Sequence, residues 1–163
     1  MTICPICGFN QKSKPGTRSH KQHRFFFGLV DLIWRATCDD LDRPFPNRER
    51  VRKWLVVKAG FYTEVAVIGL GENVLPPALK EEMAKQAPEI FFVPSRDEQF
   101  IRILKAKSIA FPENGGDIDG KSFSELMNKA ITATIDEVLP GVVKDDIIAE
   151  IEALTRVPWR DVK

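Results

Sequence analysis

The chain has 163 residues, of which 44% are hydrophobic and 29% charged, and its formal net charge is +1. These values are ordinary for one folded domain, and they exclude an intrinsically disordered chain, a collagen and a long coiled coil. No apolar run approaches the roughly 20 residues that span a bilayer, and the N-terminus lacks the pattern of a secretory signal, so we expect a cytoplasmic protein without membrane contact.

Charge is unevenly distributed along the chain. Residues 1–58 contain twelve Lys and Arg against five Asp and Glu, whereas residues 110–163 contain six against eleven. Such asymmetry is expected when one end of a protein faces a polyanion. A basic face that is merely solvated produces the same pattern, so the charge alone leaves both interpretations open.

Two helices are predicted in the basic part of the chain. Apolar residues recur at three- and four-residue spacing from Ser19, a suitable N-cap, to about Thr37. A turn-rich linker follows. Asn47 is placed to cap a second helix, short and amphipathic, which ends where Gly60 supplies a stop.

A sheet is predicted in the middle of the chain. β-Branched and aromatic residues predict strands at about 61–68, 89–93 and 100–111. Between the first two strands, a loop and a short helix at about 78–86, which begins after a proline pair, indicate an excursion from the sheet.

Two further helices are predicted at the acidic end. The first opens at Asp119 or Ser122 and stops at Pro140-Gly141, and the last covers about 144–154. The predicted fold class is therefore α+β, with a short β-sheet packed by amphipathic helices. We expect one such domain over residues 18–163, preceded at 1–17 by a CPxC tail or zinc knuckle.

Cysteine and histidine spacing near the N-terminus suggests a metal site. Cys4 and Cys7 form a CPxC turn, and His20 and His23 lie about one helical turn apart. Together they approach the Cys2His2 pattern of a tetrahedral zinc site, although the histidines are one residue closer than usual. The alternative is a tail with two free thiols and two solvated histidines. Zinc is the only cofactor that the sequence suggests.

Basic residues on the two N-terminal helices are the candidate nucleic-acid ligands. Phosphate binding needs several cations on one face, and a helix N-terminus adds hydrogen-bond donors. Three-residue spacing places such cations along one edge of a helix. The candidates are Arg18, Lys21 and Arg24 on the first helix and Arg50, Arg52 and Lys53 on the second.

Other patterns argue for binding rather than catalysis. The aromatic run at 25–27 is compatible with base stacking, although burial in the core explains three aromatics at a helix start better. The chain lacks a Gly-rich phosphate loop, a nucleophile elbow and a carboxylate cluster placed for two metals. We therefore expect no enzymatic activity.

The order of several short motifs resembles that of phage recombination proteins. RSHKQHRFFFGLVDLIW at 18–34 is similar to the RS-x-x-Q-N/H-R helix start of the phage Orf (NinB) family, and to the HR-x-FF start of a related family of uncharacterised phage proteins. RVRKWLVVKAGFY, LKAKSIAF and FSELMNKAI follow in matching order. Through this motif Gln22 joins the candidate binding residues, although Gln22 and His23 can instead cap or brace the helix.

The resemblance implies a homodimer that binds single-stranded DNA. In this interpretation the protein helps a phage recombinase to load where single-strand binding protein stands in the way. The alternative is a zinc-stabilised adaptor that contacts a protein partner through the acidic C-terminal helices. Salt dependence separates the two, because phosphate contacts weaken steeply as salt rises whereas an apolar protein interface does not.

Overall fold

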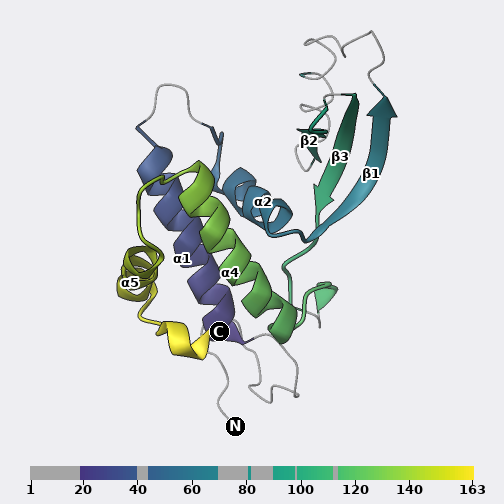
Figure 1. Ribbon diagram of the computed structural model, residues 1–163. Coiled ribbons are helices and arrows are strands. Elements are labelled where there is room, and N and C mark those ends of the chain that lie inside the picture. The colour runs from purple at the N-terminus through teal and green to yellow at the C-terminus, as the bar shows by residue number, and fades with distance from the viewer. Residues whose placement is uncertain (1–18, 40–43, 70–80, 82–89, 98, 112–113) are drawn as a thin grey trace.

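The predicted fold class, a small α+β single domain, is confirmed by a computed structural model (Figure 1). The structure describes residues 19–39, 44–69, 81, 90–97, 99–111 and 114–163. Their elements are α1 (His20–Thr37), α2 (Arg48–Lys58), β1 (Tyr62–Gly69), β2 (Ile90–Pro94), β3 (Phe100–Ala106), α4 (Gly120–Glu137), α5 (Lys144–Thr155) and the 3-10 turn η2 (Trp159–Asp161). The helix predicted at about 78–86 lies, except for Glu81, outside the described residues. No helix within the described ranges is both long and apolar enough to cross a membrane.

The helical layer is centred on α1 and α4, which lie side by side (Figure 1). Helix α5 packs against α1. Helix α2 lies between the α1–α4 pair and the sheet. Phe25 and Phe26 are fully buried, and the Phe26 ring meets the ring of Phe123 in α4 edge-on at a centroid distance of 5.7 Å. Phe27 is 38% exposed. Two of the three aromatics at the start of α1 are therefore core residues, each worth about 1.5–3 kcal/mol when buried.

Three of the helices begin at predicted caps. Ser19 Oγ accepts a hydrogen bond from the Gln22 backbone N–H (3.2 Å), and Gln22 Oε1 accepts one from Ser19 N–H (3.0 Å), which completes a capping box. Asn47 caps α2. Asp119 rather than Ser122 caps α4, and the bond from the Ser122 N–H lowers the pKa of the Asp119 carboxyl below its ordinary value.

The strands form an antiparallel sheet in the order β1-β3-β2. Strand β3 ends at Ala106, so the prediction that it continues to Phe111 was wrong. The reason lies in its neighbour, because β1 begins at Tyr62, directly after the turn that ends α2. The Lys107 N–H donates a last hydrogen bond to Phe61 O (3.0 Å). Beyond Lys107, the described residues include no strand with which β3 could pair.

The sheet reaches away from the helical layer and meets it through α2 (Figure 1). The central strand β3 is the buried one, since Ile101, Ile103 and Leu104 are at most 4% exposed. In the edge strand β1, Val65 and Val67 are 55% and 52% exposed. Within the described residues the sheet packs against the helical layer mainly at α2, and the two hollows described below lie beside that helix.

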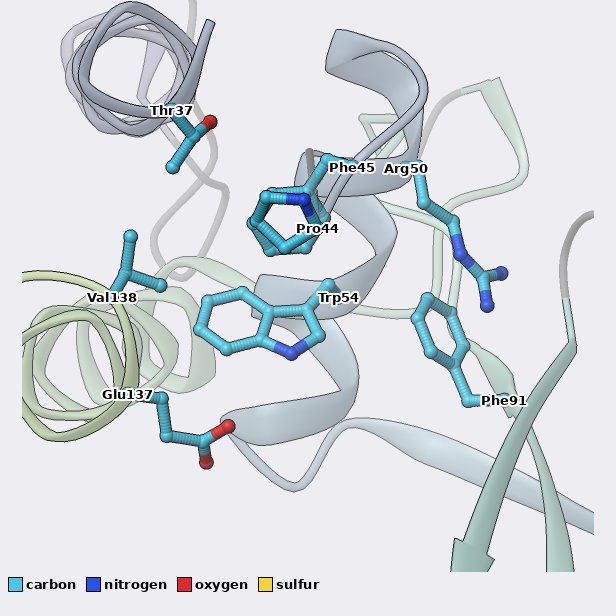
Figure 2. A pocket seen from close by; sticks show the side chains of 8 residues that line it. All are labelled: Thr37, Pro44, Phe45, Arg50, Trp54, Phe91, Glu137 and Val138. Atoms are coloured by element: carbon cyan, nitrogen blue, oxygen red, sulfur yellow. The ribbon is translucent and has the colours of Figure 1, made fainter. Parts of the chain in front are cut away.

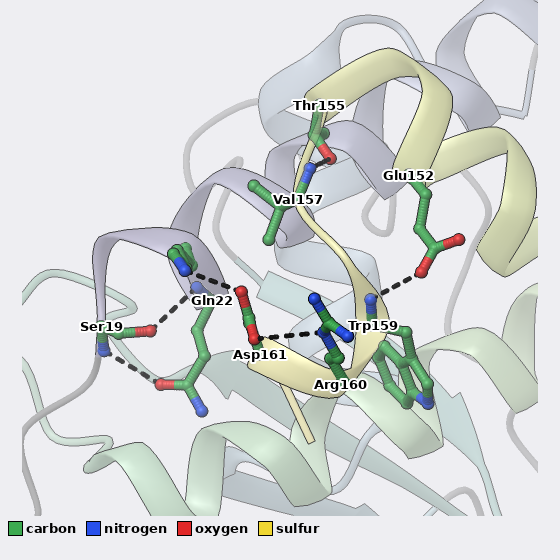
Figure 3. A network of polar contacts seen from close by, with 9 residues as sticks. Ser19, Gln22, Glu152, Thr155, Val157, Trp159, Arg160 and Asp161 are labelled. Atoms are coloured by element: carbon green, nitrogen blue, oxygen red, sulfur yellow. Dashed lines mark hydrogen bonds and ion pairs between the residues drawn. The ribbon is translucent and has the colours of Figure 1, made fainter.

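The C-terminal residues return to the start of α1 (Figure 3). There Gln22 forms a hydrogen bond to the backbone of Val162. Gln22 is 8% exposed. Its Nε2 donates to Gly120 O (3.0 Å), Ser124 Oγ (2.9 Å) and Val162 O (3.0 Å). Because its amide oxygen is used in the capping box as well, Gln22 braces the fold. We therefore leave it out of the candidate DNA interface.

Candidate nucleic-acid interface

Of the three predicted cations at the start of α1, Lys21 and Arg24 lie within the helix. Helix α1 begins only at His20, and Arg18 lies outside the described residues. Lys21 Nζ lies 2.7 Å from Asp161 Oδ2, and this pairing lowers the pKa of the Asp161 carboxyl. An exposed ion pair contributes only about 0–1 kcal/mol, so Lys21 stays accessible to a phosphate despite its pairing with Asp161. Arg24 is accessible because its side chain is exposed.

Arg50 is held by the fold. Its Nη2 donates to Ile90 O (3.0 Å), and its guanidinium carbon lies 3.6 Å from the centroid of the Phe91 ring. Burial lowers the pKa of the Arg50 guanidinium, which nevertheless stays charged because the ordinary value is so high. Arg50 therefore ties α2 to strand β2, and a phosphate would have to share it with these contacts.

Arg52 and Lys53, the other predicted cations of α2, line a hollow between this helix and the sheet. The hollow has a volume of about 470 Å³. Its walls come from α2, β1, β3 and the segment after β3, and the lining residues are Arg52, Lys53, Thr63, Lys105, Ala106, Lys107, Ser108 and Asp117. Four cations face a single carboxylate in this lining. We name it the basic hollow.

Glu49 offsets part of the charge of the basic hollow. Its carboxylate accepts a hydrogen bond from Arg52 Nε (2.8 Å) and lies 3.7 Å from Lys53 Nζ. The hydrogen bond from Arg52 is the main reason that the pKa of the Glu49 carboxyl is lowered. The side chains of Arg52 and Lys53 are only 16% and 14% exposed, so an anion that enters the hollow meets partly desolvated cations.

The sequence pattern did not single out Lys105 and Lys107 as candidate site residues. They lie two residues apart on an extended chain and therefore point to the same side, which is a signal that the sequence does contain. Which side of the strand faces Arg52 and Lys53 depends on how β3 packs against α2, and no local pattern carries that information.

A second hollow, of about 500 Å³, lies on another side of α2 (Figure 2). Figure 2 shows the Trp54 ring near its centre, with the end of α4 on one side and β2 on the other. The rings of Phe45 and Trp54 meet at a centroid distance of 5.3 Å and an angle of 65°. We name it the aromatic hollow, and its lining residues are Thr37, Pro44, Phe45, Arg50, Trp54, Phe91, Glu137 and Val138.

The two histidines of the predicted zinc site lie together at the start of α1. The rings of His20 and His23 each contact the Phe111 ring at a centroid distance of 4.9 Å, and Nδ1 of His23 is buried. Cys4 and Cys7 lie outside the described residues. Among the side chains that the structure does describe, no group of three metal ligands occurs. Half of the predicted ligand set is thus brought together, and the zinc site stays a prediction.

If Cys4, Cys7, His20 and His23 converge on one zinc ion, the purified protein should carry close to one equivalent of zinc, because a structural site with four closed ligands survives purification. Cys4→Ser should lose most of this metal. Cys38→Ser is the matched control, since Cys38 is a free, half-buried cysteine outside the motif. Elemental analysis measures the content, and a wild-type value below about a tenth of an equivalent would rule the site out.

Comparisons with protein-family models, with curated proteins and with solved structures found no match to this chain. The likeness to phage recombination proteins therefore rests on the short motifs alone.

Proposed function

We propose that the protein binds single-stranded DNA through the basic hollow, without catalysis, and assists homologous recombination in a phage or prophage. The observation that carries the proposal is the convergence of Arg52, Lys53, Lys105 and Lys107 on one space. Several cations around one space favour phosphate binding, because each neutralised phosphate releases condensed counterions from the nucleic acid.

The segment that follows β3 supports a longer path for the bound DNA strand. Lys107 lines the basic hollow, and Phe111 a few residues on packs against the two histidines at the start of α1. A strand that follows this segment from the hollow approaches the exposed side chains of Lys21 and Arg24. Asp161, from the acidic C-terminal part of the chain, pairs with Lys21 there, so a phosphate that reaches Lys21 would compete with this carboxylate.

The role in recombination rests on the motif resemblance at 18–34 and on the motifs that follow it. The same resemblance implies three partners, namely a phage recombinase, single-strand binding protein and a second copy of this chain. A cytoplasmic location belongs to the same proposal, because those partners act on DNA inside the cell.

Replacing both Lys105 and Lys107 with alanine should weaken binding to single-stranded DNA. We expect the slope of log affinity against log salt to flatten by about 1.4, at about 0.7 for each phosphate that is no longer neutralised. Both side chains are exposed, so the fold should tolerate the change. Fluorescence anisotropy with a labelled oligonucleotide, from about 50 to 200 mM salt, gives the slope.

The matched control is Lys129→Ala/Lys144→Ala, which removes the same charge from exposed positions in α4 and α5. Its slope should equal that of the wild type. If the Lys105 and Lys107 variant also keeps the wild-type slope, the basic hollow is only a solvated face. The zinc-stabilised adaptor then becomes the better explanation of the protein.

A further inference from the structure

The aromatic hollow has the composition of a pocket for a flat ring (Figure 2). Phe45 is 5% exposed and packs edge-on against Trp54, which fixes the position of the indole ring. Trp54 and Phe91 are half-buried, and the Arg50 guanidinium covers one face of the Phe91 ring. Base stacking requires an aromatic or guanidinium face that is held in place, and the hollow contains both kinds of group.

Arg50 extends this aromatic wall. Its guanidinium lies 3.6 Å from the centroid of the Phe91 ring, while the bond to Ile90 O fixes its position. A guanidinium plane is itself a stacking surface for a base. Because Arg50 and Phe91 already hold each other, a base that stacks here orders few side chains, which lowers the entropic cost of binding.

Polar groups stand beside the rings. Glu137 at the end of α4 lines the hollow, and its Oε1 lies 2.7 Å from Lys58 Nζ, which in turn lies 6.0 Å from the centroid of the Trp54 ring. The Glu137 side chain is 45% exposed. A carboxylate in this position can accept an N–H from the edge of a base, while Lys58 keeps its negative charge from repelling the strand.

We propose that the aromatic hollow takes one unpaired nucleobase of the bound strand, stacked on Trp54 and Phe91. The proposal rests on the proposed function, since it assigns the second hollow to another part of the same ligand. Its volume of about 500 Å³ lies within the range of small-molecule sites. Lys53 lines the basic hollow and Trp54, its neighbour in α2, lines the aromatic hollow, so the two hollows flank the same helix.

This assignment explains how the protein would prefer single strands. Phosphate contacts in the basic hollow position a strand but do not depend on unpaired bases. A base within a duplex is paired and stacked on its neighbours, so entry into the aromatic hollow would require it to leave the helix at a cost of a few kcal/mol. Only a single strand presents the base without that cost.

The test compares two oligonucleotides of equal length and charge, an oligo-dT strand and the same strand with every base removed. Wild type should bind oligo-dT about five- to a hundredfold more tightly than the abasic strand, the range expected for stacking of one base. Phe91→Leu should reduce this preference to less than about twofold while affinity for the abasic strand stays unchanged. The matched control is Phe27→Leu, which removes an exposed aromatic of α1 outside the hollow and should keep the preference.

A second measurement, of tryptophan fluorescence, uses a variant that keeps an aromatic ring at position 54. Oligo-dT should quench tryptophan fluorescence in the wild type, and Trp54→Phe should remove most of the quenching while it retains a stacking ring and hence most of the affinity. The Lys105 and Lys107 variant should weaken binding of both strands alike, because it removes phosphate contacts only.

The outcomes separate the two proposals. Equal affinity of the wild type for both strands, a preference that survives in Phe91→Leu, or one that is lost in Phe27→Leu as well would overturn the nucleobase site and leave the proposed function standing. Binding of neither strand by the wild type would overturn the proposed function, and the nucleobase site with it.

Discussion

Replacing Gln22 with glutamate is expected to lower the free energy of unfolding by about 3–5 kcal/mol at pH 7, as an uncompensated buried charge does. Gln22 is 8% exposed, and its amide nitrogen faces three oxygens, those of Gly120 O, Ser124 Oγ and Val162 O. A carboxylate has no N–H to donate to them. It would also place its negative charge against two carbonyl oxygens, so the connection between α1 and the C-terminus should be lost.

The stability lost in Gln22→Glu is expected to shrink as the pH falls. Burial and the facing oxygens raise the pKa of the new carboxyl in the folded state above its unfolded value of about 4.3. A group with a raised folded pKa contributes its full stability below the unfolded pKa and loses it as the pH rises through the folded pKa. The difference in the free energy of unfolding between Gln22→Glu and wild type should therefore be smallest near pH 4. It should reach about 3–5 kcal/mol near pH 7.

Gln22→Leu is the matched control, because leucine fills a similar space and does not titrate. Its loss of stability relative to wild type should be independent of pH. Urea unfolding of the three proteins at several pH values measures the differences. A Gln22→Glu variant whose deficit did not change with pH would contradict the bracing role of Gln22.

Replacing Gly28 with alanine is expected to lower the free energy of unfolding by about 1–3 kcal/mol, the usual cost of overpacking. A Cβ at Gly28 would overlap Cγ2 of Thr155 and would lie 2.9 Å from Cγ2 of Ile151. Both side chains are β-branched and stiff, and Thr155 Oγ1 is further held by its bond to Ile151 O (2.7 Å). Alanine gains up to about 1 kcal/mol of helix propensity over glycine, but the two fixed methyl groups should outweigh that gain.

A double variant separates the steric effect from other consequences of the change. Thr155→Ser removes the methyl group nearest to Gly28 and keeps the hydroxyl, so Gly28→Ala/Thr155→Ser should recover part of the stability that Gly28→Ala loses. Urea unfolding of the single and double variants completes the cycle. A Gly28→Ala protein more stable than wild type would mean that α1 and α5 are not packed this closely.

Local structure was predictable wherever its cause lies within a few residues of sequence. The capping side chains of Ser19 and Asn47 bond to backbone groups of the adjacent turn, and the apolar period of α1 follows from helix geometry. For the same reason Asp119 was one of the two caps proposed for α4. The end of β3 was not predictable, because a strand ends where its neighbour does, and that neighbour lies about forty residues earlier in the chain.

The sequence by itself determined which charges are available, and it indicated Arg52 and Lys53 because phosphate binding needs several cations close together on a helix. Only the tertiary structure decided how they are used. It brought Lys105 and Lys107 to the same hollow, tied Arg50 to strand β2 and buried Gln22 under the C-terminus. The physical reason is that binding sites of this kind form between elements distant in sequence. Their geometry depends on the packing of β3 against α2, which is a cooperative result of the whole core.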